Sequence, residues 1–173
     1  MALLEIVNYP DPVLLTVGKP FHDDEFNADL EQLVSNMFET MENAGGVGLA
    51  APQVGVSKRL FVMDVPDSDG GRERRALVNP EIIHIEGEQT SEEGCLSFPG
   101  LYQAVTREMR VVARARDLKG EKFELDVTEL AARCILHETD HCDGIVFLDR
   151  MTSLKRELAK RKIKRLQKSG KWD

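Results

Sequence analysis

The chain has 173 residues, of which 42% are hydrophobic and 31% charged, and its formal net charge is −7 at pH 7. These values are ordinary for a globular protein, and the length suits one domain with a core of its own. No apolar run is long enough to span a bilayer, which excludes a transmembrane protein. No signal peptide is expected, because the chain opens on MALLEIVNYPDP, which has no basic leader. Three cysteines are too few, and an odd number, for a disulfide framework, which indicates a reducing compartment.

The first long element is predicted by hydrophobic residues at helical spacing. They recur from Leu30 to Met41 and indicate an amphipathic helix over about Ala28 to Asn43, which the pair Gly45-Gly46 ends. The apolar run from Leu60 to Met63 is then typical of a buried strand.

Short strands dominate the middle of the chain. After a loop at Gly70-Gly71 we expect two strands, at residues 76–78 and 82–85, on either side of Pro80. Alternating residues from Val111 to Arg116 predict a half-buried strand, and residues 117–120 should turn it back into a hairpin.

A second helix follows this hairpin. Asp126 and Glu129 have the spacing of a capping box and predict its start, and Gly144 predicts its end. Because the strands follow one another as hairpins and do not alternate with helices, we expect an α+β fold of mostly antiparallel sheets. The sheets should surround this central helix, with one helix near the N-terminus and another at the C-terminus.

The central helix carries HETDH, His137 to His141, with two histidines four residues apart. Residues at this spacing share one helix face, about 6 Å apart at Cβ, so both imidazoles can bind one ion. Glu138 is turned by about 100° around the helix from His137. This direction suits contact with a metal-bound water better than direct binding to the metal. The pattern predicts a metal site, and two histidines in the core by accident are the alternative.

Such a pair needs a third ligand that can lose a proton. Cys134 lies seven residues before His141, about 10 Å along the helix, and Cys142 points away from that face. Glu157 is the weaker candidate, inside a basic segment. Cys95, on the bend of EEGCLSFPG, completes a thiolate and two imidazoles and leaves a fourth position open, as in catalytic sites. A buried core thiol is the alternative for Cys95.

Three motifs in this order resemble the peptide deformylase family. They are GVGLAAPQVG (Gly46 to Gly55), EGCLSFP (Glu93 to Pro99) and HETDH, and the N-terminal YPDPVL (Tyr9 to Leu14) also fits. The likeness covers about Leu4 to Met151. HExxH alone is shared by many metallopeptidases, whereas the three motifs together are specific. Cys142 departs from the leucine expected after the second histidine.

The resemblance implies a reaction and a metal. The chain would remove the formyl group from the N-terminal methionine of newly synthesised polypeptides. Cys95, His137 and His141 would bind one divalent ion, typically Fe²⁺, although Zn²⁺, Ni²⁺ and Co²⁺ also suit these ligands. Glu138 would act as general base and general acid.

The resemblance also assigns the binding of the substrate. Gln53 would donate its side-chain amide, and Leu96 its backbone N–H, to the formyl oxygen. Val47 and Gly48 would offer backbone groups to an extended peptide. On the helical wheel, Leu130 lies two turns and Cys134 one turn before His137, on the same face. They would line an apolar pocket for a methionine side chain, with plain core packing as the alternative.

Charge divides the chain into an acidic body and a basic end. From Thr152 to Asp173 there are nine Lys and Arg residues against Glu157 and Asp173, a net of +7, so the remainder carries −14. We expect a catalytic domain over residues 1–151 and a basic helical tail over residues 152–173. Such a tail attracts polyanions, and the resemblance suggests the ribosome as its partner. A solvated surface helix is the alternative.

Two other functions share the central motif. One is a zinc endopeptidase built on HExxH, and the other is a non-catalytic module with a structural metal. We expect a protein without membrane contact, in the bacterial cytoplasm or in an organelle after removal of a transit peptide.

Overall fold

The computed structural model describes residues 2–67 and 69–172. Its α-helices are α1 (Ala28–Asn43), α2 (Glu129–Cys142) and α3 (Ser153–Lys168), with 3-10 turns at Pro12–Leu15, Asp23–Glu25, Ala51–Val54 and Phe147–Arg150. The larger sheet has the order β1 (Gly48–Ala50), β2 (Leu60–Pro66), β3 (Arg72–Glu86), β6 (Arg110–Arg116) and β7 (Lys122–Thr128). A second sheet pairs β4 (Gln89–Gly94) with β5 (Tyr102–Arg107). The named strands pair only antiparallel, which confirms the expected α+β fold.

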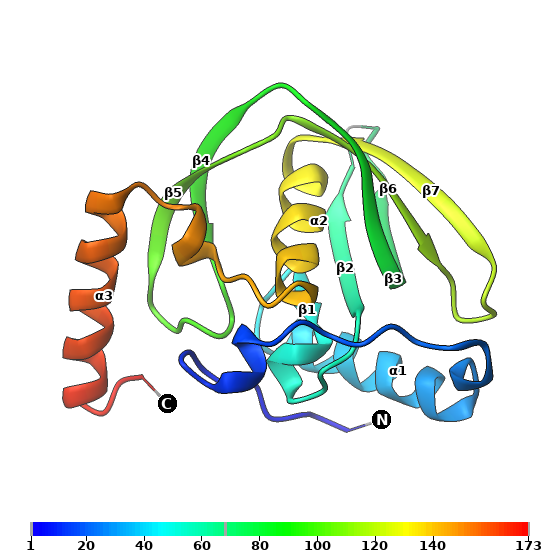
Figure 1. Cartoon of the computed structure of the whole chain (residues 1–173), viewed down its shortest axis with the longest axis horizontal. Coiled ribbons are helices and arrows are strands. Elements are labelled where there is room, and N and C mark those ends of the chain that lie inside the picture. The colour runs from blue at the N-terminus through cyan, green and yellow to red at the C-terminus, as the bar shows by residue number, and fades with distance from the viewer. Residues whose placement is uncertain (1, 68, 173) are drawn as a thin grey trace.

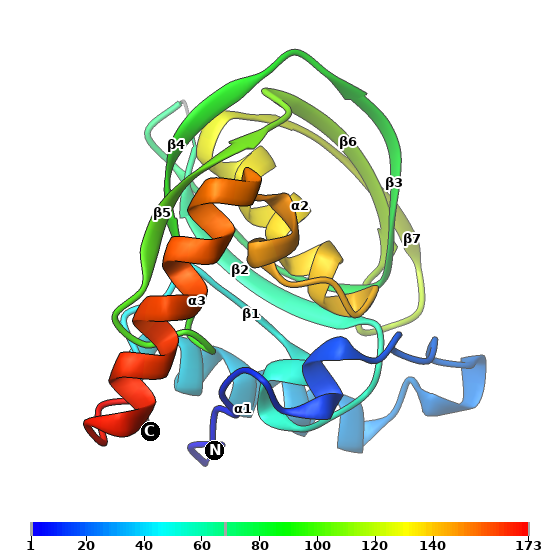
Figure 2. The same ribbon diagram turned by 60° about the vertical axis from the view of Figure 1, so that its left-hand side comes forward.

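The helix α2 lies at the centre of the molecule (Figure 1). The larger sheet curves around one side of it and the β4–β5 hairpin covers another, so that strands surround the helix (Figure 2). Its fully buried residues Ala132 and Ile135 share a core cluster with Phe61 and Met63 of β2. Packing on the sheet therefore fixes which face of α2 points toward the β4–β5 hairpin.

The helix α1 has the bounds that its periodicity predicts. The side chain of Asn27 caps it by accepting hydrogen bonds from the backbone N–H groups of Asp29 and Leu30. Its buried Leu30, Val34 and Met37 pack in one cluster with Leu60 of β2. The helix α1 therefore covers the sheet at its first two strands, β1 and β2.

The prediction of two strands around Pro80 is wrong. One strand, β3, runs through the proline, and its register with β6 shifts between Val78 and Glu81. Asn79 adopts a positive φ of 53° there, and its side-chain amide exchanges two hydrogen bonds with the backbone of Phe21. The local irregularity accommodates the missing N–H of proline without ending the strand.

The predicted capping box before α2 is also wrong. Asp126 belongs to β7, and its carboxylate pairs with Arg110 on the neighbouring strand β6. The strand continues to Thr128, so the helix begins at Glu129 without a side-chain cap. The carboxylate of Asp126, which its spacing predicted as a helix cap, instead forms a cross-strand ion pair.

The β4–β5 hairpin was not predicted from the sequence. Strand β4 consists of polar residues and glycine, QTSEEG, which give no hydrophobic alternation. Its pairing with β5 ends at Gly94 opposite Tyr102, so Cys95 is the first residue of the turn that closes the hairpin. This turn brings Cys95 to the face of α2 that the larger sheet leaves free.

The helix α3 packs against the outside of the molecule beside the β4–β5 hairpin (Figure 2). Its Ala159 and Ile163 are buried in one cluster with Leu14, Phe98 and Phe147. The boundary at residue 151 between domain and tail stays a prediction. Among the described residues, none of the helices combines the length and the apolar character that crossing a bilayer requires.

Candidate active site

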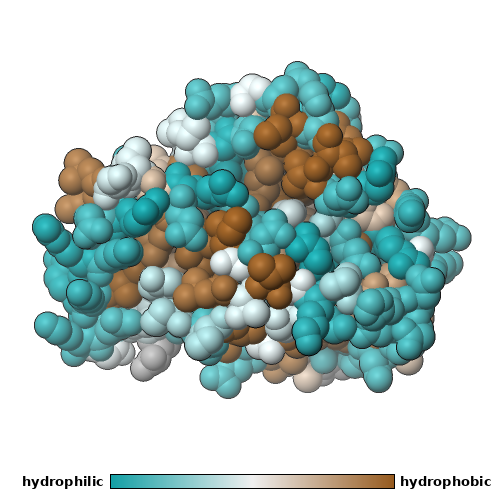
Figure 3. Space-filling model, in the orientation of Figure 1, coloured by the Kyte–Doolittle hydropathy of each residue, from teal (hydrophilic) through white to brown (hydrophobic). Residues whose placement is uncertain are grey.

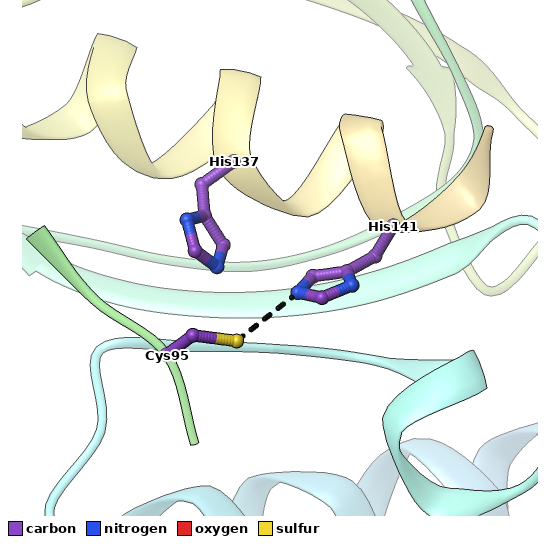
Figure 4. Close-up of side chains that lie close together, drawn as sticks. All are labelled: Cys95, His137 and His141. Atoms are coloured by element: carbon purple, nitrogen blue, oxygen red, sulfur yellow. Dashed lines mark hydrogen bonds between the residues drawn. The ribbon is translucent and has the colours of Figure 1, made fainter. Parts of the chain in front are cut away.

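The two histidines of α2 and the cysteine of the hairpin turn meet in one place (Figure 4). Donor atoms of Cys95, His137 and His141 all lie within 4.8 Å of one another. The sulfur of Cys95 is 3.4 Å from Nε2 of His141. Two donors bound to one tetrahedral ion at about 2.3 Å (sulfur) and 2.1 Å (nitrogen) lie roughly 3.5 Å apart, so this spacing suits a shared metal.

The surroundings of these three residues also fit a divalent metal. A thiolate and two neutral imidazoles are ligands that first-row divalent ions accept. Burial lowers the pKa of His141 well below its ordinary value, which keeps its imidazole neutral and able to bind a metal. Oε1 of Glu138 is buried and has no hydrogen-bond partner among the described residues, as expected where a water belongs between carboxylate and metal.

The other two cysteines are ordinary buried thiols. Burial raises the pKa of Cys134 well above its usual value, and it raises that of Cys142 to about 12. The sulfur of Cys134 lies 3.7 Å from the carbonyl oxygen of Val47, and that of Cys142 lies 3.9 Å from the carbonyl oxygen of Leu60. Both thiols stay protonated and neither belongs to the metal-binding group.

A buried carboxylate orients the first histidine. Nδ1 of His137 donates a hydrogen bond to Glu93, which leaves Nε2 as the atom that faces Cys95 and His141. Arg107 and Arg133 donate to the same carboxylate at 2.7 and 2.6 Å, and all three charged side chains are at most 5% exposed. Burial acts to raise the pKa of Glu93, but the hydrogen bonds from His137 and Arg107 outweigh it and hold that pKa well below its usual range.

The same network holds the helix near the second histidine. Asp140, directly before His141, accepts hydrogen bonds from Arg107 at 2.7 Å and from Arg150 at 2.9 Å. Arg107 therefore joins the hairpin strand β5 to both Glu93 on β4 and Asp140 on α2. The charges are buried in pairs, as such groups require in a protein interior.

Glu138 lies against the backbone of β1. Burial raises the pKa of its carboxyl group to about 7. A Cβ placed on Gly48 would come within 2.7 Å of Oε2 of Glu138 and within 2.8 Å of the sulfur of Cys134. Only glycine allows this approach of strand and carboxylate. The carboxyl group is poised to take up and release a proton near neutral pH.

Gln53 is fixed beside the cysteine turn. It is 1% exposed, and its Oε1 accepts a hydrogen bond from the backbone N–H of Ala50 at 2.9 Å. Its amide nitrogen lies 3.2 Å from Oγ of Ser97 and 3.5 Å from the sulfur of Cys95. These contacts orient the NH₂ group of Gln53 toward the metal ligands, next to Leu96 in the same turn.

A cavity of about 270 Å³ opens in front of Cys95 and His137. Nine of the ten residues selected from the sequence line it: Val47, Gly48, Gln53, Cys95, Leu96, Leu130, Cys134, His137 and Glu138. His141 does not line the cavity, although its Nε2 contacts Cys95. The structure thus brings the predicted site residues together.

Sequence reasoning missed the charged network behind the ligands. Glu93, Arg107, Arg133 and Asp140 are each less than 8% exposed, although such residues are usually on the surface. The available signal was their position: Glu93 lies two residues before Cys95, and Asp140 directly before His141. Tyr102, which lines the cavity mouth and is 63% exposed, was also missed.

Comparison with known proteins identifies the relatives of this chain. A family model described as polypeptide deformylase matches residues 3–157. Peptide deformylases of Acidobacterium capsulatum and Chromobacterium violaceum are each 49% identical, covering 99% and 98% of this chain and 100% and 99% of those proteins. A crystal structure of a peptide deformylase from Legionella pneumophila is 44% identical with a TM-score of 0.84, covering 95% of this chain and 97% of that one. One from Ehrlichia chaffeensis in complex with actinonin is 36% identical with a TM-score of 0.87, covering 95% and 98%.

Replacing Glu93 by glutamine should weaken the binding of metal. Glutamine lacks the negative charge to which His137 and two arginines bind. Loss of such a partner of a metal ligand typically costs about 10–100-fold in metal affinity. The buried Arg133 would also lose its counter-charge, while Arg107 keeps Asp140, and breaking a buried ion pair destabilises a fold by about 3–5 kcal/mol. Metal affinity by chelator competition and thermal unfolding measure the two effects. Glu88→Gln, at an exposed glutamate, is the control, and unchanged affinity in Glu93→Gln would refute this role.

Proposed function

This chain belongs to the polypeptide deformylase family, and from that premise we propose how its own residues divide the work of the reaction. It is a metal-dependent hydrolase that removes the formyl group from the N-terminus of newly made polypeptides. One water is added across the formyl amide bond, which releases formate and a free α-amino group. The zinc endopeptidase and the structural metal module therefore do not apply.

The close group of Cys95, His137 and His141 is the observation that supports our assignment of the metal ligands. A divalent ion held by these three residues would supply a water whose pKa is lowered toward about 7. Glu138 accepts the proton of the attacking water and donates it to the leaving amine nitrogen. Its buried, unpartnered oxygen and its raised pKa of about 7 support this double role.

Gln53 and Leu96 serve the oxygen of the formyl group. This oxygen becomes negatively charged as water adds to the formyl carbon, and preorganised donors stabilise that charge. The side-chain NH₂ of Gln53, oriented by its contacts with Ala50 and Ser97, is one donor. The backbone N–H of Leu96, next to the cysteine ligand, is the other.

The substrate backbone lies along the edge of the larger sheet. Strand β1 is the first strand in the sheet order, and within the part of the chain that the structure describes it pairs with β2 alone. Val47, the residue before this strand, and Gly48, its first residue, line the cavity. Strand addition there would bind any extended peptide through its main chain, without reading later side chains.

The first side chain of the substrate enters between Leu130 and Cys134. Both line the cavity, the thiol of Cys134 is protonated and buried, and Leu130 is 43% exposed at the mouth. Their apolar surfaces suit the methionine side chain of a formyl-methionyl chain.

We assign Fe²⁺ as the native ion, although Zn²⁺, Ni²⁺ and Co²⁺ also suit one thiolate and two imidazoles. Cys95 is half-buried and lines the cavity, so oxygen can reach both the thiolate and the metal.

The helix α3 is proposed to bind ribosomal RNA. Lys160, Lys164 and Lys168 lie on it, all exposed, and the surface over α3 is mostly hydrophilic (Figure 3). A cationic helix binds polyanions with a steep dependence on salt. The enzyme belongs where formyl-methionyl chains are made, the bacterial cytoplasm or an organelle, and its relatives come from bacteria and plants.

Glu138→Gln should retain the metal and lose turnover. Glutamine matches glutamate in shape but cannot accept a proton, and general base catalysis contributes about 10²–10⁴-fold to rates. The measurement is kcat on a formyl-Met peptide together with metal content. A variant with near-native turnover would remove Glu138 from the mechanism.

A panel of peptides tests the pocket. Formyl-norleucine peptides should react nearly as fast as formyl-Met peptides, because an apolar pocket discriminates by roughly 1–3 kcal/mol per methylene-sized change. Formyl-Asp should react much more slowly, because the hydration shell of its carboxylate would be removed beside Leu130 and Cys134. The comparison is by kcat/KM. Equal values for formyl-Met and formyl-Asp would remove the pocket and leave the reaction standing.

Air should inactivate the iron enzyme faster than its nickel form. Ferrous iron and its thiolate ligand are both oxidisable, whereas Ni²⁺ does not react with oxygen in this way. Protein purified without oxygen is assayed for metal content and for the half-life of its activity in air. Zinc as the ion found in the cell, or equal half-lives for both forms, would contradict the iron assignment.

Replacing Lys160, Lys164 and Lys168 together by glutamine should reduce co-sedimentation with ribosomes at low salt. Three fewer cations flatten the salt dependence of binding. Turnover of a short formyl peptide should not change, because none of the three lines the active-site cavity. The control replaces the exposed Lys19, Lys119 and Lys122, which changes the net charge equally. Equal loss of binding in both variants would mean that total charge matters and α3 does not.

A further inference from the structure

The last described residues turn back onto the body of the protein. After α3 the chain reverses at Gly170, which has a positive φ of 72°, and Lys171 donates a backbone hydrogen bond to Leu166. Figure 1 shows this end of the chain pointing toward the N-terminal segment. As a result Trp172 is only 4% exposed.

The indole N–H and the backbone carbonyl of Trp172 both form hydrogen bonds with the segment Asn8–Tyr9. Its indole Nε1–H donates to the carbonyl oxygen of Tyr9 at 2.7 Å, and its own carbonyl oxygen accepts from the side chain of Asn8 at 2.7 Å. Two hydrogen bonds to neighbouring residues fix the orientation of the indole ring.

The indole ring packs edge-on against Phe98. The two ring centroids are 5.9 Å apart with an interplanar angle of 85°. Tyr9 stacks on Phe98 at 4.9 Å, and Phe147 meets it edge-on at 4.9 Å. Three aromatic side chains thus enclose Phe98, which is 1% exposed.

Phe98 belongs to the turn that carries the cysteine ligand. Its backbone N–H donates to the carbonyl oxygen of Cys95 at 2.9 Å, and Tyr9 donates its N–H to the carbonyl oxygen of Ser97 at 3.0 Å. Cys95 itself packs against the same cluster. The ring of Phe147 also lies 5.9 Å from that of His137. The aromatic cluster therefore contacts the metal site from two sides.

We propose that Trp172 is a positioning residue for the metal site. By packing against Phe98, it keeps the Cys95–Phe98 turn in the position where the thiolate lies close to both histidines. This inference rests on the proposed function of Cys95 as a metal ligand. Without the indole, Phe98 and Tyr9 would relax into the space left behind, and the turn would sample conformations with the sulfur displaced. A displaced sulfur releases the metal faster.

The test uses the full chain loaded with Co²⁺, whose thiolate charge-transfer absorption reports on the cysteine ligand. Trp172→Ala should weaken this absorption and release Co²⁺ to a chelator roughly three- to tenfold faster than the unaltered protein. This is less than the 10–100-fold typical for a direct partner of a ligand. Trp172→Phe, which keeps a ring but loses the N–H, should recover most of the difference. If Trp172→Ala does not fold, Trp172→Leu replaces it, with the same expectation.

Ile163→Ala is the matched control. Ile163 is 3% exposed in the same core cluster, but it lies on α3 and not on the reversed end of the chain. Thermal unfolding of each variant gives its loss of stability. Faster release in the Trp172 variant than in Ile163→Ala, at a similar loss of Tm, supports the proposal.

Two outcomes would overturn the inference and one would overturn its premise. Equal release rates in the Trp172 and Ile163 variants at similar Tm would show only general destabilisation. Unchanged release in the Trp172 variant would show no role at all. If the unaltered protein lacked the thiolate absorption, or Cys95→Ser retained it, the ligand assignment itself would fail.

Discussion

Burying a carboxylate away from water costs free energy unless cations surround it. The buried carboxylate of Glu93 accepts hydrogen bonds from Arg107, Arg133 and the Nδ1–H of His137. The positions of three elements depend on this contact, because Glu93 lies on β4, Arg107 ends β5, and both Arg133 and His137 lie on α2. The hairpin cannot slide along the helix without breaking charged hydrogen bonds in a dry interior. The turn that carries Cys95 begins two residues after Glu93, so the same contact sets the distance between thiolate and histidines.

The rest of the fold encloses this contact and leaves one opening. The larger sheet fixes the rotation of α2, which decides that the histidines face the hairpin and that Glu138 faces Gly48. The edge of β1 then borders the cavity, where a peptide strand has room. Binding of the peptide backbone therefore uses β1, whereas the proton-transfer group and both histidines lie on α2, which packing on the sheet keeps rigid.

Much of this arrangement is predictable from the sequence because it is periodic or local. Spacing alone predicts α1 and places both histidines on one face of α2, and the bend around Cys95 indicates the third ligand. The β4–β5 hairpin is not predictable in this way, because backbone hydrogen bonds and a buried Glu93 hold a strand with no apolar pattern. Burial of Arg133 depends on partners distant in sequence, and β3 continues through Pro80 because Asn79 bonds to Phe21. Such long-range compensation has no local signal.

The central claim is that Cys95, His137 and His141 bind one ion together. X-ray absorption of the zinc-loaded protein tests it most directly. We expect one sulfur at about 2.3 Å and two nitrogens at about 2.0–2.1 Å, with the sulfur lost in Cys95→Ser. A spectrum without sulfur in the unaltered protein, or a sulfur shell that persists in Cys95→Ser, would contradict the account.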